Sequence, residues 1–134
     1  MAGSFSNFLE LELLDHVWGN SAYSVPATLY IALFTIAPTD AGAGTECSGG
    51  SYARVAVTNN VTNWPNAADG AKANGADFSF VTATGDWGTC VAMGIFDALT
   101  NGNLLAWADL TASKDVASGD TAKFPTGNID ITLD

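Results

Sequence analysis

Positive charge is scarce in this sequence: four Lys and Arg residues stand against 14 Asp and Glu residues, which gives a formal net charge of -10. Binding to nucleic acid depends largely on clustered cations that displace the counterions of the phosphate backbone. We therefore expect no direct DNA or RNA partner. The acidic balance favours a protein that faces solvent and stays soluble at high local concentration.

Charged residues of both signs make up only 13% of the chain, whereas they make up about 25% of ordinary soluble domains. Much of the surface must then be neutral or built of small side chains. We expect neighbouring subunits to cover part of that surface, so a self-associating protein is favoured over an isolated monomer.

Long apolar runs are absent as well. No stretch approaches the roughly 20 continuous apolar residues of a membrane-spanning helix. The N-terminus also lacks the basic flank and apolar segment of a signal peptide. We expect no membrane partner.

Residues suited to catalysis or metal binding are few. The single histidine, His16, falls inside a predicted helix without the convergent partners that a Ser-His-Asp or Cys-His site requires. The cysteines show no zinc spacing, and the glycine-rich loop with Asp40 and Glu46 lacks the alternating acidic ligands of a calcium loop. We predict that the protein is not an enzyme and binds no cofactor or metal.

The two cysteines, Cys47 and Cys90, leave two alternatives open. They could form a disulfide, although a domain of this size does not need one for stability. In such a domain two cysteines are more often buried small apolar side chains or free thiols, and this second alternative is favoured.

Short period-two patterns separated by Gly, Asn and Pro turns fill most of the chain and predict strands. One convincing helix precedes them, opened by Ser4 or Ser6 and closed by Gly19. The length fits a single domain, 1–134, with the N-terminal helix over residues 1–19 and a β-rich body over residues 26–134. We predict a mainly β fold: a β-sandwich or partly closed barrel of about seven antiparallel strands with one N-terminal α-helix.

Details of the predicted body follow from local patterns. Residues 27–36 are apolar without a break, which predicts a central strand covered on both faces. Residues 40–51 and 64–75 are typical of surface loops. In residues 87–96 every second side chain is small, which indicates that another element, such as the N-terminal helix, approaches that face closely. Asn101-Gly102 predicts a two-residue hairpin turn.

The predicted helix has an apolar surface wider than one stripe, because Leu11, Leu14 and Trp18 extend it. Either the helix packs against the body and also against a partner, or it is simply buried on its own sheet. Trp18 and Trp64 could anchor an interface or belong to the core. The candidate interface residues are Phe5, Phe8, Leu9, Leu13, Trp18, Asp40, Glu46, Tyr52, Arg54 and Trp64.

Several segments, in order along nearly the whole chain, carry a family resemblance. They are LLDHVWG at residues 13–19, PATLYIALFT at 26–35, PTDAG at 38–42, ECSGGSYARVAV at 46–57, WP at 64–65, WG at 87–88, GIFD at 94–97, LLAW at 104–107 and IDITL at 129–133. In combination they resemble a family of small bacteriophage virion proteins. Its members are often labelled tail fibre proteins, and some are head decoration or cement proteins.

The resemblance implies a structural role in the virion and carries over no catalytic residue. It implies a capsid decoration protein, a homotrimer on the outer head surface, whose partner is the major capsid protein. The alternative that it implies is a tail fibre or tail adaptor protein. Cys47 and Cys90 depart from the family pattern, which adds weight to a disulfide specific to this virus.

Overall fold

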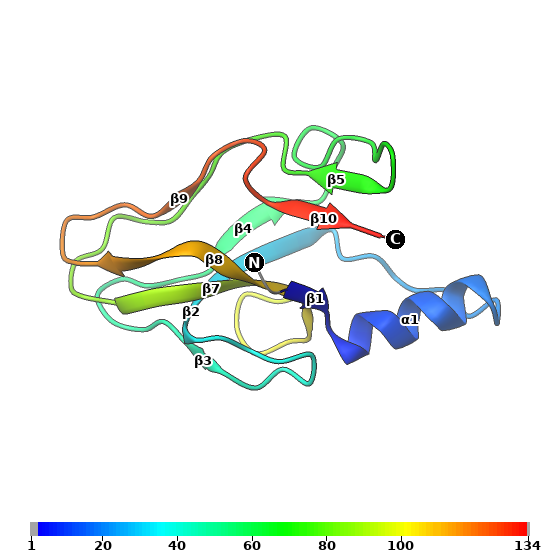
Figure 1. Ribbon diagram of the computed structural model, residues 1–134, viewed down its shortest axis with the longest axis horizontal. Helices are drawn as coiled ribbons and strands as arrows, with labels where there is room; N and C mark the ends of the chain where they lie inside the picture. The colour runs from blue at the N-terminus through cyan, green and yellow to red at the C-terminus, as the bar shows by residue number, and fades with distance from the viewer. Residues whose placement is uncertain (1–2, 134) are drawn as a thin grey trace.

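The computed structural model describes residues 3–133, which form a mainly β fold with one helix and antiparallel strand pairs (Figure 1). The elements in chain order are β1 (Gly3–Phe5), α1 (Asn7–Val17), β2 (Thr28–Ile36), β3 (Thr45–Glu46), β4 (Val55–Thr58), β5 (Ala71–Ala73), β6 (Phe78–Ser79), β7 (Gly88–Phe96), β8 (Leu104–Val116), β9 (Lys123–Phe124) and β10 (Asp130–Thr132). The predicted sandwich is confirmed, and the strands of this part of the chain do not close into a barrel.

One large sheet organises the fold. Its strands lie in the order β1-β8-β7-β2-β3, and β4 also pairs with β2. The strand β2 therefore has β7 on one side and the short strands β3 and β4 on the other. This is the central position that the apolar run of residues 27–36 predicts.

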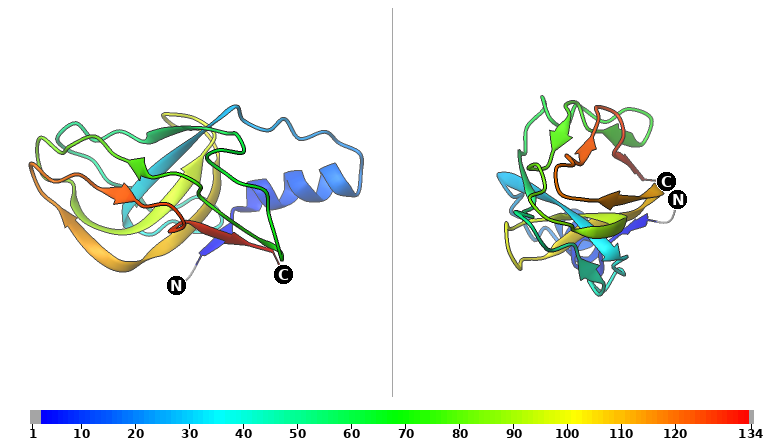
Figure 2. Two further views of the ribbon diagram at one scale, coloured as in Figure 1. Left: turned by 90° about the horizontal axis from the view of Figure 1, so that it is seen from above. Right: turned by 90° about the vertical axis from the view of Figure 1, so that its left-hand side faces the viewer.

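Two small sheets, β10-β5 and β6-β9, form a second layer over one face of the large sheet (Figure 2). The main core lies between the layers and is rich in aromatic rings. Tyr52 packs edge-on against Trp87 with the ring centroids 5.1 Å apart, and Trp64 lies 5.3 Å from Phe78. Such rings bury large apolar areas and account for much of the cohesion between the layers.

Both faces of β2 are covered, as predicted. Ile31 and Leu33 point into the main core, whereas Ala32 and Phe34 lie in a second apolar cluster. Successive side chains of a strand point to opposite faces, so this second cluster lies on the outer side of the large sheet. There the ring of Phe34 stacks on that of Phe96, with the centroids 6.1 Å apart.

The structure corrects several predicted boundaries. Residues 3–133 contain ten strands instead of about seven. The helix begins only after Ser6, because the three residues of β1 pair with β8. The strands β3 and β5 lie in the segments 40–51 and 64–75, which were expected to be loops. Strands of two or three residues are too short to show a period-two pattern. The partner of β5 is also distant, because β5 pairs with β10 at the end of the chain.

An irregularity between β7 and β8 changes the direction of one side chain. The pairing runs to Ala92 and Asp109 and resumes at Cys90 and Lys114, so that residues 110–113 bulge out. Across this irregularity Cys90 faces the main core, while Ala92 lies on the outer face. Strict alternation would have placed both on one face.

The small residues of β7 do not receive the helix, contrary to prediction. A Cβ atom on Gly94 would lie 2.9 Å from the ring of Phe34 and 3.0 Å from the side chain of Leu104, so these two side chains cover that face. The helix α1 contacts β8 and β1 instead. The pattern identified a close approach correctly, but the approaching groups are side chains of the same sheet.

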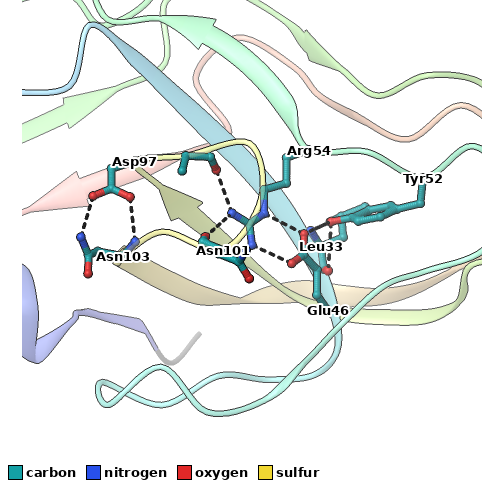
Figure 3. Close-up of polar contacts among 8 residues, drawn as sticks. Leu33, Glu46, Tyr52, Arg54, Asp97, Asn101 and Asn103 are labelled. Carbon is teal, nitrogen blue, oxygen red and sulfur yellow. Dashed lines mark hydrogen bonds and ion pairs between the residues drawn. The ribbon is translucent and has the colours of Figure 1, made fainter.

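A hairpin joins β7 to β8, but the predicted two-residue turn is corrected, because the connection between the paired residues Phe96 and Leu104 spans residues 97–103. Asn101 and Gly102 have φ values of 53° and 74°, which asparagine and glycine adopt more readily than other residues. Asp97 closes the turn because its carboxylate accepts hydrogen bonds from the backbone N–H and the side-chain amide of Asn103, at 2.7 and 2.8 Å (Figure 3).

Candidate docking surface

The helix α1 is anchored in the body at its first turn. Ser6 is the N-cap, and its hydroxyl accepts a hydrogen bond from the N–H of Leu9 at 3.2 Å and donates one to the carbonyl of Leu104. The N–H of Ser6 donates to the carbonyl of Leu105 at 2.8 Å. Because Ser6 is only 2% exposed, the start of the helix is fixed inside the protein.

Asp40 holds the same region from the glycine-rich loop. Its carbonyl accepts a hydrogen bond from the N–H of Asn7 at 2.9 Å, and its carboxylate accepts one from the indole Nε1–H of Trp107 at 2.9 Å. One residue therefore joins the loop, the first turn of α1 and β8. Asp40, a predicted interface residue, acts within the chain to fix the direction of the helix.

Beyond its first turn α1 projects away from the sandwich, and the following residues return to β2 (Figure 1, Figure 2). We call residues 7–27 the N-terminal arm. The N–H of Ser21 donates to the carbonyl of Asp15 at 3.0 Å, and the N–H of Tyr23 donates to Nδ1 of His16 at 3.2 Å. These bonds tie the returning segment to the helix, so the arm is an ordered protrusion.

Apolar side chains are exposed along this arm. None of the residues of α1, all of which the structure describes, is buried. The exposed fractions are 62% for Leu11, 53% for Leu14, 59% for Val17, 78% for Trp18 and 68% for Val25. Leu11, Leu14 and Trp18 are three and four residues apart and so lie on one face of the helix. Exposed apolar side chains gathered in this way are typical of interaction sites.

The charge of the arm is negative. Glu10, Glu12 and Asp15 lie on α1, and the first Lys or Arg of the whole sequence is Arg54. A partner must therefore either carry positive groups around an apolar patch or meet the arm where salt screens its charge.

The remaining candidates in β1 and α1 are partly buried. Phe8 and Leu9 are partly buried and pack against the main core, while Phe5 and Leu13 are also partly buried. Phe8 and Leu9 therefore contact their own chain, and contact of these four residues with a partner stays a prediction. The alternative of a helix buried on its own sheet is wrong too, because no residue of α1 is buried.

Three other candidate interface residues, Glu46, Tyr52 and Arg54, bind one another (Figure 3). Nε and Nη2 of Arg54 donate to the two carboxylate oxygens of Glu46 at 2.9 and 2.8 Å, and the hydroxyl of Tyr52 donates to Glu46 at 2.8 Å. The side chain of Arg54 is only 6% exposed. These three groups therefore bind one another within the chain, and their contact with a partner stays a prediction.

Arg54 also reaches the hairpin turn between β7 and β8. Its Nη1 donates to the carbonyls of Ala98 and Asn101, both at 2.8 Å, and its guanidinium lies 3.6 Å from the centroid of the Phe96 ring. Burial raises the pKa of Tyr52, so its hydroxyl stays protonated and continues to donate to Glu46. The network fixes the shape of this end of the large sheet.

Trp64 lies inside the body, whereas the single histidine, His16, lies on the arm. Trp64 is 5% exposed and belongs to the main core, so its ring is not available to a partner and that prediction is corrected. His16 lies on the exposed arm. Within residues 3–133 no group of three or more His, Cys, Asp or Glu side chains could hold a metal ion, and α1 is too short to cross a membrane.

A hollow of about 650 Å³ opens between β8 and residues 120–131. Met93 and Ile95 of the main core line it from one side, and Phe124 and Ile131 line it from the other. The two layers of the sandwich are thus less tightly closed here than at the end that holds the stacked aromatic rings.

The fold and the arm define a class: a small β-sandwich protein with a projecting helix, whose N-cap is buried in the body and whose outer face is apolar. A family model described as Podophage GP4 fiber I protein gp80 matches residues 4–132. The chain belongs to this family. No curated protein gives a significant match. The resemblance to small phage virion proteins is thereby confirmed, and the chain is a phage structural protein of the fibre type and a component of the virion.

Proposed function

We propose that the chain is a structural subunit that attaches to its neighbours in the virion through the N-terminal arm. The observation that carries this proposal is the exposed apolar face of Leu11, Leu14 and Trp18 on a helix whose start is buried. A surface that is already ordered loses little conformational entropy on binding, so more of the contact energy is kept as affinity.

In the first form of the proposal the protein is a capsid decoration, or cement, protein. It binds the outer surface of the head and stabilises contacts between major capsid proteins. The short chain and its net charge of -10 support this form, because a crowded layer of many copies must stay soluble. Modest contacts suffice in such a layer, since multivalency raises the effective concentration of each subunit.

A tail fibre or tail adaptor protein is the second candidate, and the description of the family as a fiber protein favours it. In this form the arm joins the sandwich to the tail. The sequence has no coiled-coil or repeated stretch of the kind that builds a long shaft, so the chain would be a globular part of such a fibre.

Both forms include self-association, for which we propose a homotrimer. The spacing of Leu11, Leu14 and Trp18 resembles the a and d positions of a heptad, which meet around a common axis in helical assemblies. The proposed role includes no catalysis and no cofactor, nucleic acid or membrane.

The copy number of the chain in purified virions separates the two forms. Quantitative mass spectrometry would compare it with the major capsid protein. A ratio close to equimolar supports decoration of the head, whereas a small fraction contradicts that form and supports the tail.

Attachment through the arm is tested with particles that lack the protein. The affinity of purified Leu14→Ser/Trp18→Ser protein for such particles should be at least about tenfold lower than that of wild type. The reason is that large apolar side chains buried at the centre of an interface carry much of its binding energy. The matched control is Val61→Ser/Leu99→Ser, which removes side chains that are 69% and 51% exposed on the body. Equal occupancy of the arm variant and the control would refute the role of the arm.

A further inference from the structure

Two thiols that are distant in sequence meet in the main core. Cys47 and Cys90 are 3% and 1% exposed, and their Sγ atoms lie 3.0 Å apart. Neither side chain takes part in the docking surface. Their contact brings together residues that are 43 positions apart in the chain.

The backbone holds both cysteines in place. The N–H of Cys47 donates to the carbonyl of Leu33 on β2 at 2.8 Å. Cys90 pairs with Lys114 next to the bulge that turns its side chain toward the core. Since a disulfide has an S–S distance of about 2.05 Å, the two sulfur atoms need to approach by only about 1 Å.

We infer that Cys47 and Cys90 are a redox pair that forms an intramolecular disulfide after the virion leaves the reducing cytoplasm. The inference rests on the family's virion membership, because virion surfaces are among the oxidising environments in which disulfides persist. It is independent of the choice between head and tail. Metal binding does not compete, since no third His, Cys, Asp or Glu of the described residues completes a metal site here.

A small peroxide is the oxidant that fits so enclosed a pair, because bulky disulfides cannot reach thiols that are nearly unexposed. The thiolate of one of the two cysteines attacks hydrogen peroxide, takes one oxygen to become a sulfenic acid, and releases hydroxide. The thiol of the other cysteine then condenses with the sulfenic acid, which forms the S–S bond and releases water. In total, two thiols and one peroxide give one disulfide and two waters.

The hydrogen bond between the two Sγ atoms has no fixed donor. The thiolate is the form that attacks peroxide, so the thiol that ionises first becomes the sulfenic acid.

The bond would close a loop that contains β4, β5 and β6 and would tie the segment after β3 to β7. Closing a loop of this length restricts the unfolded chain. We expect oxidation to raise the melting temperature by roughly 10 °C or more.

The test uses the wild-type full chain, purified with reductant and then treated with hydrogen peroxide. The protein is denatured in iodoacetamide without reductant, and its intact mass is measured. We expect the oxidised protein to take up no alkyl group, the reduced protein to take up two, and a peptide pair linked through Cys47 and Cys90 to appear after digestion. The melting temperature is measured on both forms.

The variants Cys47→Ala and Cys90→Ala are the matched controls, in which peroxide should leave the melting temperature unraised. The inference is overturned if the oxidised wild type still takes up two alkyl groups, if it carries sulfinic acid without a cross-link, or if the link joins two chains on a non-reducing gel. It is also overturned if denatured virions released from cells show both thiols free.

Discussion

The indole N–H of Trp107 donates a hydrogen bond to the carboxylate of Asp40, with the nitrogen and oxygen 2.9 Å apart. Because Asp40 also binds the N–H of Asn7 through its carbonyl, this contact connects β8 to the start of the helix. The direction of the arm thus depends on residues that lie outside its apolar face. The direction of the arm and its apolar face can therefore be changed by separate substitutions.

Replacement of Asp40 tests the contacts that hold the first turn of the arm against the body. We expect Asp40→Ala to lower the free energy of unfolding by about 1–3 kcal/mol, because the indole N–H loses a charged acceptor. Urea denaturation measures the change. Hydrogen exchange at the amides of Asn7 and Leu9 should also become faster. In a double-mutant cycle with Trp107→Phe the two effects should be less than additive, and full additivity would mean that the bond contributes nothing.

Self-association through the arm should strengthen with salt. The arm carries Glu10, Glu12 and Asp15, so copies that meet along its apolar face repel one another at low ionic strength. Sedimentation at roughly 0.05 and 0.5 M salt should show a larger share of oligomer in the second buffer. Trp18→Ser should abolish this oligomer, whereas Val61→Ser should not. An oligomer that dissociates as salt rises would instead indicate attraction between opposite charges.

The Arg54 network should be sensitive to the loss of either partner alone. We expect Arg54→Met to destabilise the protein by about 3 kcal/mol, because it leaves Glu46 without its cation and three carbonyl or ring contacts unmade. The pair Arg54→Met/Glu46→Leu should cost less than the sum of the single changes, since no unpaired charge remains. The urea midpoints of Arg54→Met, Glu46→Leu and the double variant measure this difference. An additive result would show that the two groups are not coupled.

Asp77 should contribute to acid sensitivity. Hydrogen bonds from the backbone N–H and hydroxyl of Thr126, with Lys123 nearby, lower the pKa of Asp77 in the folded protein. The unfolded chain therefore takes up this proton first as pH falls. The stabilisation is present above the ordinary aspartate pKa of about 3.9 and is lost as pH falls through the lower folded value.

The measurement is the urea midpoint of wild type and Asp77→Asn between about pH 2 and pH 6. The variant should be less stable at the upper end, and the difference should vanish at the lower end. Asp69→Asn makes the same change of charge in the turn before β5 and serves as the control. A constant difference across the range would mean that ionisation of Asp77 is not involved.

Local patterns predicted the parts of the fold that depend on neighbours in sequence. The unbroken apolar run of β2 required a strand with both faces covered, and Asn101-Gly102 correctly marked a reversal between two strands, although the loop spans residues 97–103 and not two residues. The shortest strands escaped notice because their pairing partners, not their own patterns, define them. The bulge opposite Val91 escaped for the same reason. The meeting of Cys47 and Cys90 was one of two alternatives left open, because the direction of the Cys90 side chain depends on this bulge.

The docking surface could be predicted only in part. The spacing of Leu11, Leu14 and Trp18 is visible in the sequence, but the same pattern fits a buried helix. The contacts that turn these residues outward join Ser6 to Leu104, 98 positions away, and Asp40 to Trp107, 67 positions away. The partners of Arg54 at Ala98 and Asn101 are likewise 44 and 47 positions away. For that reason Arg54 looked like a surface residue in the sequence although it is an internal tie.

The N-terminal arm is inserted between β1 and β2, and both strands belong to the large sheet with β8 and β7 between them. A mechanical force that acts on the tip of the arm would therefore enter the sheet at two separate strands. The hydrogen bonds of four neighbouring strands would share that load, so the short edge strand β1 would not carry it alone. A particle component that is pulled or pressed at its attachment point would gain resistance to rupture from this connection alone.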